Sequence, residues 1–440
     1  MRSSSCRLLQ FLLCASLLQA QTVRHLTILH SNDLHAHLVP DDAGMGGFAY
    51  LAAAVRAERS HCAACLYLNA GDLVQGTPVS TIFRGVPIYE IGNLLGFDAA
   101  VIGNHEFDYG WQAIRHFAKI ANYPLLAANV LDGQGRLLTG KPYVILNASG
   151  IRVAVIGVVL GDLDKDFETP EQLGPVSVTP VVETVSRYAR ELRDKSDLIV
   201  VLGHIHDAEA GDILRDVPEV SVVIVGHSHK EYPELRQVDG RVAALVQGYG
   251  VELGRLELDL DMESRRAHVT EWKKILIDSK KITPALDVAR EVAQWEEKVS
   301  KIVDVPIGES ARRLDHNELR SLIERIMTEQ MGADLAFLNS GGVRDDLPAG
   351  TILARNIWNI LPFDNVLVVG TFKGSQLPPA VTRGHAIGPR RNYKLVTTDF
   401  IAANQDAPQE LNTHGLQFPV KGPLIRDAVI DWIRKRKHIE

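Results

Sequence analysis

The sequence has no internal repeat, and beyond its first 20 residues it has no apolar run long enough to span a bilayer. Its formal net charge of −7 lacks the basic excess that general nucleic-acid binding favours. We therefore expect no repeat architecture, no membrane span in the mature chain and no nucleic-acid partner. The sequence leaves the oligomeric state open.

Cysteine is scarce, with four residues in the whole chain. Cys6 and Cys14 fall within residues 1–20, where early arginines and a short apolar run are typical of a secretory signal peptide. We predict that this segment directs export to the periplasm or the cell exterior and is then removed; a short membrane anchor is the alternative. For the remaining pair, Cys62 and Cys65, an exported protein favours a local structural disulfide over a free or redox-active pair.

The length of 440 residues and the apolar content of 46% suggest two domains with sizeable cores. Strand-like and helix-like segments alternate from residue 25 to about 275, which predicts an α/β fold. Helices are expected at Phe48–Arg59, Trp111–Ile120 and Val181–Lys195. A pair of strands is expected at Arg241–Gln247 and Glu252–Asp261.

A charged amphipathic helix is expected over Asp278–Ile302, and we interpret it as the connection between the two domains. A second α/β pattern begins at Val305. It comprises helices and strands expected at Leu319–Met331, Val366–Phe372, Lys394–Thr398 and Ile425–Lys435.

Polar side chains follow five buried-strand patterns in the first 230 residues. They are Asp33 and His35, then Asp72, then Asn104, then His204, and finally His227 and His229. A glycine directly precedes the first of these residues after four of the five strands, where it lets the backbone turn sharply. Strands of an α/β sheet that end at one place build a site there, so we expect the seven side chains to converge.

The chemistry of this set predicts the ligand. Aspartate, histidine and one asparagine, without cysteine, suit borderline divalent ions such as Zn²⁺, Mn²⁺, Fe²⁺ or Co²⁺. Seven ligands are too many for one tetrahedral ion. They suit two ions that share a bridging carboxylate, as in hydrolytic two-metal sites.

The order of these motifs resembles the calcineurin-like metallophosphoesterases and, more narrowly, the 5'-nucleotidase family. The segments Leu338–Arg344 and Leu361–Asn365 are similar to that family's substrate domain, and the likeness covers about residues 25–410. It implies an N-terminal four-layer αββα sandwich at 21–275, a linker helix at 276–304 and a smaller C-terminal α/β substrate-binding domain at 305–440.

The resemblance also implies roles for the polar residues. One metal would be held by Asp33, His35 and His229, the other by Asn104, His204 and His227, with Asp72 bridging both. His105, oriented by Asp108, would contact the phosphoryl group, and metal-bound water would attack phosphorus in line.

In the second domain the resemblance implies contacts to the nucleotide. Arg344 and Arg320 would meet phosphate, and Asn339 would shape the adjacent loop. Phe363 and Phe400 would stack on the base, while Asn365 and Asp406 would hydrogen-bond to base or ribose. The family usually has two glycines before that aspartate, where this chain has Asn404 and Gln405.

The expected activity is hydrolysis of nucleoside 5'-monophosphates to nucleoside and phosphate. One alternative is the same chemistry on 2',3'-cyclic nucleotides, nucleotide sugars or other phosphate esters. An alternative from another class is a nucleotide-binding protein without catalytic activity.

Overall fold

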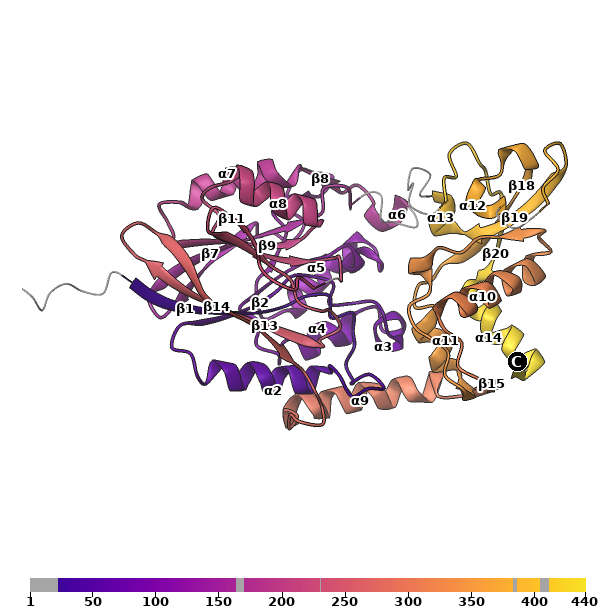
Figure 1. The fold of residues 1–440 in the computed structure, drawn as a ribbon, viewed down its shortest axis with the longest axis horizontal. Helices are drawn as coiled ribbons and strands as arrows, with labels where there is room; N and C mark the ends of the chain where they lie inside the picture. The colour runs from indigo at the N-terminus through magenta and orange to yellow at the C-terminus, as the bar shows by residue number, and fades with distance from the viewer. Residues whose placement is uncertain (1–22, 164–169, 230, 383–385, 404–410) are drawn as a thin grey trace, which may run out of the picture.

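The computed structural model describes residues 23–163, 170–229, 231–382, 386–403 and 411–440. The predicted signal segment, residues 1–20, lies outside this part of the chain. A larger and a smaller α/β half are connected by α9 (Leu286–Val303), which runs along one side of the molecule (Figure 1). No helix in the described ranges has both the length and the apolar composition needed to cross a membrane.

The larger half contains two six-stranded sheets. The first has the order β14 (Arg266–Leu276), β13 (Glu252–Asp261), β1 (Val23–Ser31), β2 (Cys65–Asn69), β3 (Ala99–Val101) and β4 (Leu125–Leu126). The second has the order β11 (Arg236–Val238), β12 (Arg241–Ala244), β10 (Val222–Gly226), β9 (Leu198–His204), β7 (Ile151–Val159) and β6 (Tyr143–Ala148).

Alternating side chains place the second sheet between two apolar layers. In β9, Leu198, Val200 and Leu202 belong to the core shared with the first sheet. The intervening Ile199 and Val201 pack on the side of the helices α7 (Val181–Leu192) and α8 (Asp207–Asp216). The other face of the first sheet is covered by helices that include α2 (Phe48–Arg59), α4 (Val86–Gly92) and α9. The four-layer αββα prediction is therefore confirmed.

The expected pairing of Arg241–Gln247 with Glu252–Asp261 is wrong. Strand β12 pairs with β10 and β11, whereas β13 pairs with β1 and β14 in the other sheet. The physical reason is the segment between them, because the Tyr249 N–H donates to the Asp33 carbonyl at 2.6 Å. That segment crosses from one sheet to the other instead of closing a hairpin.

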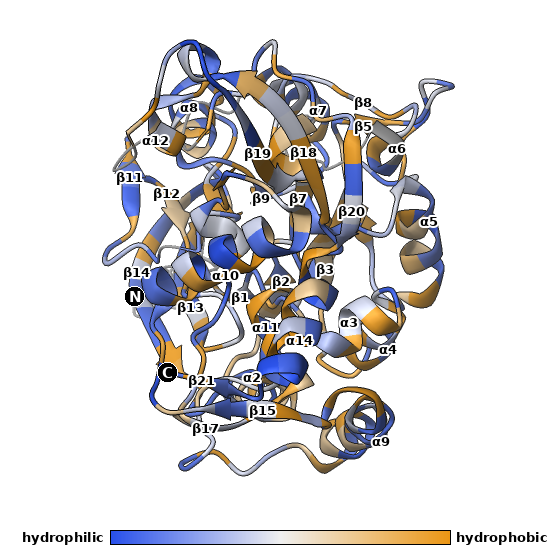
Figure 2. Cartoon of the chain, turned by 90° about the vertical axis from the view of Figure 1, so that its right-hand side faces the viewer, coloured by the Kyte–Doolittle hydropathy of each residue, from blue (hydrophilic) through white to orange (hydrophobic). Residues whose placement is uncertain are grey.

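The connecting helix begins later than expected, at Leu286 instead of Asp278. Residues before it are tied to the loop after β1, because the Ser279 N–H donates to Gly44 O at 2.9 Å and Met45 bridges Asp278. Figure 2 shows apolar and polar residues together along α9, and its buried face includes Val288, Val292, Val299 and Val303. These valines belong to the core of the larger half, so α9 packs against that half as well as connecting the two halves.

The smaller half contains a three-stranded and a four-stranded sheet. The first has the order β17 (Gly350–Leu353), β15 (Pro306–Ser310) and β21 (His438–Ile439), and the second has the order β16 (Leu335–Ala336), β19 (Asn392–Thr398), β18 (Val366–Lys373) and β20 (Val420–Leu424). The helices α10 (His316–Met331), α11 (Ala354–Ile360) and α14 (Ile425–Arg436) contribute to a separate core. Trp358 of α11 packs against both this core and that of the larger half.

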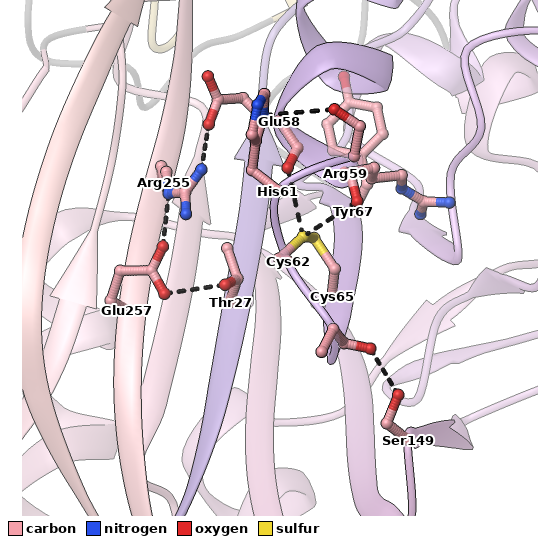
Figure 3. The surroundings of a disulfide bond; sticks show 12 residues. Thr27, Glu58, Arg59, His61, Cys62, Cys65, Tyr67, Ser149, Arg255 and Glu257 are labelled. Carbon is pink, nitrogen blue, oxygen red and sulfur yellow. Dashed lines mark hydrogen bonds and ion pairs between the residues drawn. A yellow bond between two sulfur atoms is a disulfide. The ribbon is translucent and has the colours of Figure 1, made fainter.

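A disulfide joins Cys62 and Cys65, with their Cα atoms 5.7 Å apart. It closes the turn between α2 and β2, next to Glu58, which forms an ion pair with Arg255 (Figure 3). The predicted local disulfide is confirmed. It lies at the start of β2, the strand whose other end leads to Asp72.

Within the first sheet, His30 is a buried side chain without hydrogen-bond partners. Its ring stacks on Trp272 with centroids 5.3 Å apart, and neither ring nitrogen has a partner in the described part of the chain. Burial lowers the pKa of His30 to about 3. The unfolded chain therefore binds a proton below about pH 6.5 that the folded protein does not bind until about pH 3.

We predict that His30→Phe flattens the acid side of the stability profile. Phenylalanine preserves the stacking on Trp272 and removes the titratable group. Wild type loses stability as the pH falls from 6.5 towards 3, and the variant should retain that stability. Wild type should lose about 2 kcal/mol more than the variant between pH 7 and pH 5. Urea unfolding of both proteins in EDTA measures the difference, and parallel profiles would contradict it.

Candidate functional site

The predicted metal ligands lie in loops with unusual backbone geometry. Five of the seven have a positive φ: Asp33 (49°), His35 (45°), Asp72 (50°), His227 (88°) and His229 (55°). Each such non-glycine residue costs on the order of 1–3 kcal/mol, and this strain typically persists at functional sites. The loops therefore hold these side chains against a local energetic preference.

Backbone hydrogen bonds hold the loops to one another. The N–H groups of Asp33, His35 and Ala36 donate to the carbonyls of Gly71, Asp72 and Leu73 at 3.0, 2.9 and 2.8 Å. The loops after β1 and β2 thus form a continuous ladder. The His227 N–H donates to both carboxylate oxygens of Asp33, at 2.9 and 3.1 Å, which ties the loop after β10 to the same place.

Two of the predicted glycines permit a close approach. A Cβ on Gly103 would lie 2.0 Å from Asp72 Oδ1, and a Cβ on Gly226 would lie 2.3 Å from Ala70 O. No side chain fits either gap. These glycines let the strand ends of the two sheets meet around Asp72.

The first group of ligand atoms is compact. One atom from each of Asp33, His35, Asp72 and His229 lies within 4.8 Å of all the others. His35 Nε2 and His229 Nε2 are 2.9 Å apart, and His229 Nε2 is 3.6 Å from Asp33 Oδ1. Mixed nitrogen and oxygen donors that converge in this way suit a divalent transition-metal ion.

The second group lies on the other side of Asp72. His204 Nε2 is 2.9 Å from Asn104 Oδ1 and 3.1 Å from Asp72 Oδ2. The rings of His204 and His227 are 5.2 Å apart. His204 is fixed through its other nitrogen, Nδ1, which lies 2.9 Å from Ala70 O.

Asp72 Oδ2 occupies the position between the two groups. It is buried and accepts no hydrogen bond from the described residues, although it lies 3.1 Å from His204 Nε2 and 3.6 Å from His35 Nε2. A buried carboxylate oxygen without a partner is costly unless an ion or a proton satisfies it. The donor set around this oxygen therefore fits divalent metal binding.

Electrostatics favour the ligand forms at most positions. Burial lowers the pKa of both His227 and His229 to about 3, so their rings are neutral at physiological pH. Burial acts to raise the pKa of Asp72, yet the imidazoles of His204 and His105 hold it well below its usual range. Neutral imidazoles and ionised carboxylates are the forms that bind metals.

His105 and Asp108 form the predicted pair next to these groups. The His105 ring nitrogen Nδ1 is 2.9 Å from Asp108 Oδ2. The backbone N–H of His105 donates to Asp72 Oδ1 at 3.1 Å. Burial acts to lower the pKa of His105, but the carboxylates of Asp108 and Asp72 raise it to about 9. The structure therefore favours a protonated imidazole facing the site.

A cavity of about 190 Å³ joins this pair to the smaller half. Its walls include most of the predicted substrate residues: Asn339, Arg344, Phe363, Asn365 and Phe400, together with Asn104, His105 and Asp108. The rings of His105 and Phe363 are 5.8 Å apart, and the Arg344 guanidinium lies 5.8 Å from the Phe363 ring.

Two predicted substrate residues are not placed in this cavity. Arg320 lies on α10 and is absent from the described residues that line the cavity. Asp406 lies outside the described part of the chain. The roles of both stay predictions.

The sequence did not reveal three residues that support the site. Tyr249 OH is 3.2 Å from His229 Nδ1 and accepts from Arg344 Nη2 at 3.3 Å, which links the two halves. The buried Glu106 carboxylate accepts from the N–H groups of Gly103 at 2.5 Å and Leu73 at 2.9 Å. Gln172 also lines the cavity. The glycines that flank Tyr249 were the only signal, and they suggested a turn.

Two family descriptions match the chain. The calcineurin-like phosphoesterase model matches residues 26–231, and the model of the 5'-nucleotidase C-terminal domain matches residues 298–383. The first range contains all seven predicted metal ligands, and the second contains Arg344 and Phe363.

Individual relatives extend over most of the chain. Protein UshA of Yersinia enterocolitica is 26% identical over 88% of this chain and 87% of its own length. A 5'-nucleotidase of Vibrio cholerae is 27% identical over 82% of this chain and 75% of its own. The crystal structure of a 5'-nucleotidase precursor from Thermus thermophilus superposes with a TM-score of 0.83 at 23% identity, over 95% and 97% of the two chains.

We predict that Gly103→Ala weakens metal binding without unfolding the protein. The added Cβ would lie 2.0 Å from Asp72 Oδ1 and force that carboxylate to move. Displacing an oriented ligand should lower metal affinity by about 10–100-fold. Isothermal titration of the metal-stripped protein with Zn²⁺ measures this change.

The matched control is Gly211→Ala, because a Cβ there meets no atom within 4 Å in α8. The control should bind Zn²⁺ like wild type and be slightly more stable. Equal affinity in the Gly103→Ala variant and wild type would show that Asp72 is not a ligand.

Proposed function

Because the chain belongs to the 5'-nucleotidase family of calcineurin-like phosphoesterases, we propose that it hydrolyses nucleoside 5'-monophosphates to nucleoside and phosphate. Membership makes it a metal-dependent phosphoric ester hydrolase. The observation that supports the finer proposal is the cavity in which His105 meets Arg344, Phe363 and Phe400. The walls of this cavity would be complementary to a phosphoryl group and a planar base.

The metal site would hold two divalent ions. Asp33, His35 and His229 would bind one, Asn104, His204 and His227 the other, and Asp72 both. When bound, such ions lower the pKa of water towards neutrality and neutralise charge on phosphoryl oxygens. The orphaned Asp72 Oδ2 and the convergent ring nitrogens support this proposal.

His105 would stabilise the phosphoryl group during transfer. Its Nδ1 is engaged by Asp108, which leaves Nε2 for the substrate. A protonated imidazole held in this way would donate a charge-assisted hydrogen bond to a phosphoryl oxygen as negative charge develops. Asp108 would fix the ring and keep its proton on Nδ1.

Arg344 would bind the phosphate from the opposite half. A guanidinium presents two parallel N–H donors that match phosphate oxygens. Its contact with Tyr249 OH, which also faces His229, would align the guanidinium with the metal side of the cavity.

Phe363 and Phe400 would bind the base. Both line the cavity, where two aromatic faces can sandwich a planar ring with little preference between bases. Asn365 is 4% exposed, and its Oδ1 has no partner among the residues that the structure describes, so it would offer a hydrogen-bond acceptor to base or ribose. Asn339 would shape the adjoining loop, since its Oδ1 would be 2.7 Å from a Cβ on Gly342.

We also propose the domain limits 21–275, 276–304 and 305–440, and export directed by residues 1–20. The separate cores of the two halves support the limits, with Trp358 at the margin of both. The Cys62–Cys65 disulfide supports an oxidising compartment such as the periplasm or cell exterior.

A substrate panel tests the proposed activity. We expect purified residues 21–440 with Mn²⁺, Zn²⁺, Co²⁺ or Mg²⁺ to release phosphate from AMP and UMP far faster than from p-nitrophenyl phosphate, and EDTA to abolish release. Phe363→Leu should raise KM for AMP about tenfold and leave an aliphatic ester such as glycerol 2-phosphate unchanged, because stacking is worth about 1–3 kcal/mol per base.

Other outcomes separate the alternatives. Preference for 2',3'-cyclic AMP or UDP-glucose would support the proposed metal chemistry but would revise the proposed substrate. Equal turnover of all esters in wild type and Phe363→Leu would refute the stacking role. Nucleotide binding without any phosphate release would identify a non-catalytic protein.

A further inference from the structure

Gln75 is a buried amide that the proposed mechanism leaves unexplained. It is 2% exposed, and neither Nε2 nor Oε1 has a hydrogen-bond partner among the described residues. Its φ of 68° is in the left-handed region, which is unfavourable for a residue with a side chain. Two unsatisfied polar atoms and a strained backbone at one position require a compensating role.

The surrounding protein does not supply that compensation. The Gln75 N–H donates to Ser80 Oγ at 2.9 Å, and Ser80 Oγ lies 2.9 Å from Tyr109 OH. The neighbouring hydroxyls are thus already paired with each other and with the backbone. Gln75 is, however, one of the residues that line a small cavity.

This cavity has polar side chains in its wall and is large enough for water. Its volume is about 30 Å³, and its walls include Gln75, Asp108, Tyr109 and Phe363. A water molecule needs roughly 10–15 Å³ of such space and two or more polar partners. Asp108 and Phe363 also line the substrate cavity, so the two spaces adjoin.

Asp108 has an oxygen that needs such a partner. The bond to His105 Nδ1, at 2.9 Å, is made by Oδ2 and leaves Oδ1 available for a second partner. A carboxylate anchored at one oxygen can rotate, and the imidazole bonded to it would follow. A second anchor would fix both groups.

We propose that Gln75 is a positioning residue for His105. Its amide binds a water in the small cavity, this water donates to Asp108 Oδ1, and Asp108 in turn holds His105 towards the phosphoryl group. The role rests on the proposed phosphohydrolase function, because it acts only through the His105–Asp108 pair. Gln75 itself touches neither substrate nor metal.

A double-mutant cycle tests this role. Gln75→Leu keeps the Cβ and the approximate volume but cannot bind water. We expect it to lower kcat on AMP about tenfold, with KM changed less than twofold, as losing an outer support of a site does. In an Asp108→Asn background Gln75→Leu should lower kcat less than twofold, because the Asp108 carboxylate through which Gln75 acts on His105 is already absent.

The control is His30→Phe, which also removes a buried, unpartnered polar group but lies outside both cavities. Its kcat should match wild type. A tenfold loss in both backgrounds, or unchanged kcat for Gln75→Leu in active enzyme, would overturn the positioning role.

A readout that does not depend on turnover separates this inference from the proposed function. A high-resolution crystal structure should show a water within hydrogen-bond distance of both the Gln75 amide and Asp108 Oδ1, and Gln75→Leu should lack it. A dry cavity overturns the inference. Wild type that releases no phosphate from any ester refutes the proposed function instead.

Discussion

The structure depends on one buried carboxylate, Asp72, around which the two sheets of the larger half end. Its Oδ1 accepts a hydrogen bond from the backbone N–H of His105. Its Oδ2 lies between His204 and His35 and has no hydrogen-bond donor among the described residues. The left-handed ligand loops and the bare Cα of Gly103 bring these groups together. Without cations this arrangement would concentrate unsatisfied polar atoms in a buried space, so the fold is organised for metal binding.

In the proposed function, the rest of the architecture would position a substrate against that site. In the αββα sandwich both sheets are covered on each face by apolar layers. The smaller half has its own core and contributes Arg344, Phe363 and Phe400 to the cavity. Contacts such as the hydrogen bond between Tyr249 and Arg344 connect the two halves. In the proposed function, reaction and recognition would therefore be built on separate scaffolds that meet at one cavity.

Much of this was predictable from local sequence patterns. Strand ends followed by a glycine predicted the positions of Asp72, Asn104, His204 and His227, and a strand end without a glycine predicted that of Asp33. The period of a strand and the turn of a glycine are local properties. Helices such as 48–59 and 111–120 were predicted at their observed bounds. The pairing of β12 and β13 was wrong, because pairing across sheets depends on contacts remote in sequence. Gln75 and Tyr249 carry no local signal of burial or of their partners.

The most direct test of the central claim is a crystal structure grown with Mn²⁺, examined for anomalous scattering. The account predicts two peaks of comparable height, one on each side of Asp72 Oδ2, with His35 and His229 at one and Asn104 and His204 at the other. A single peak, or two peaks that do not share Asp72, would contradict it.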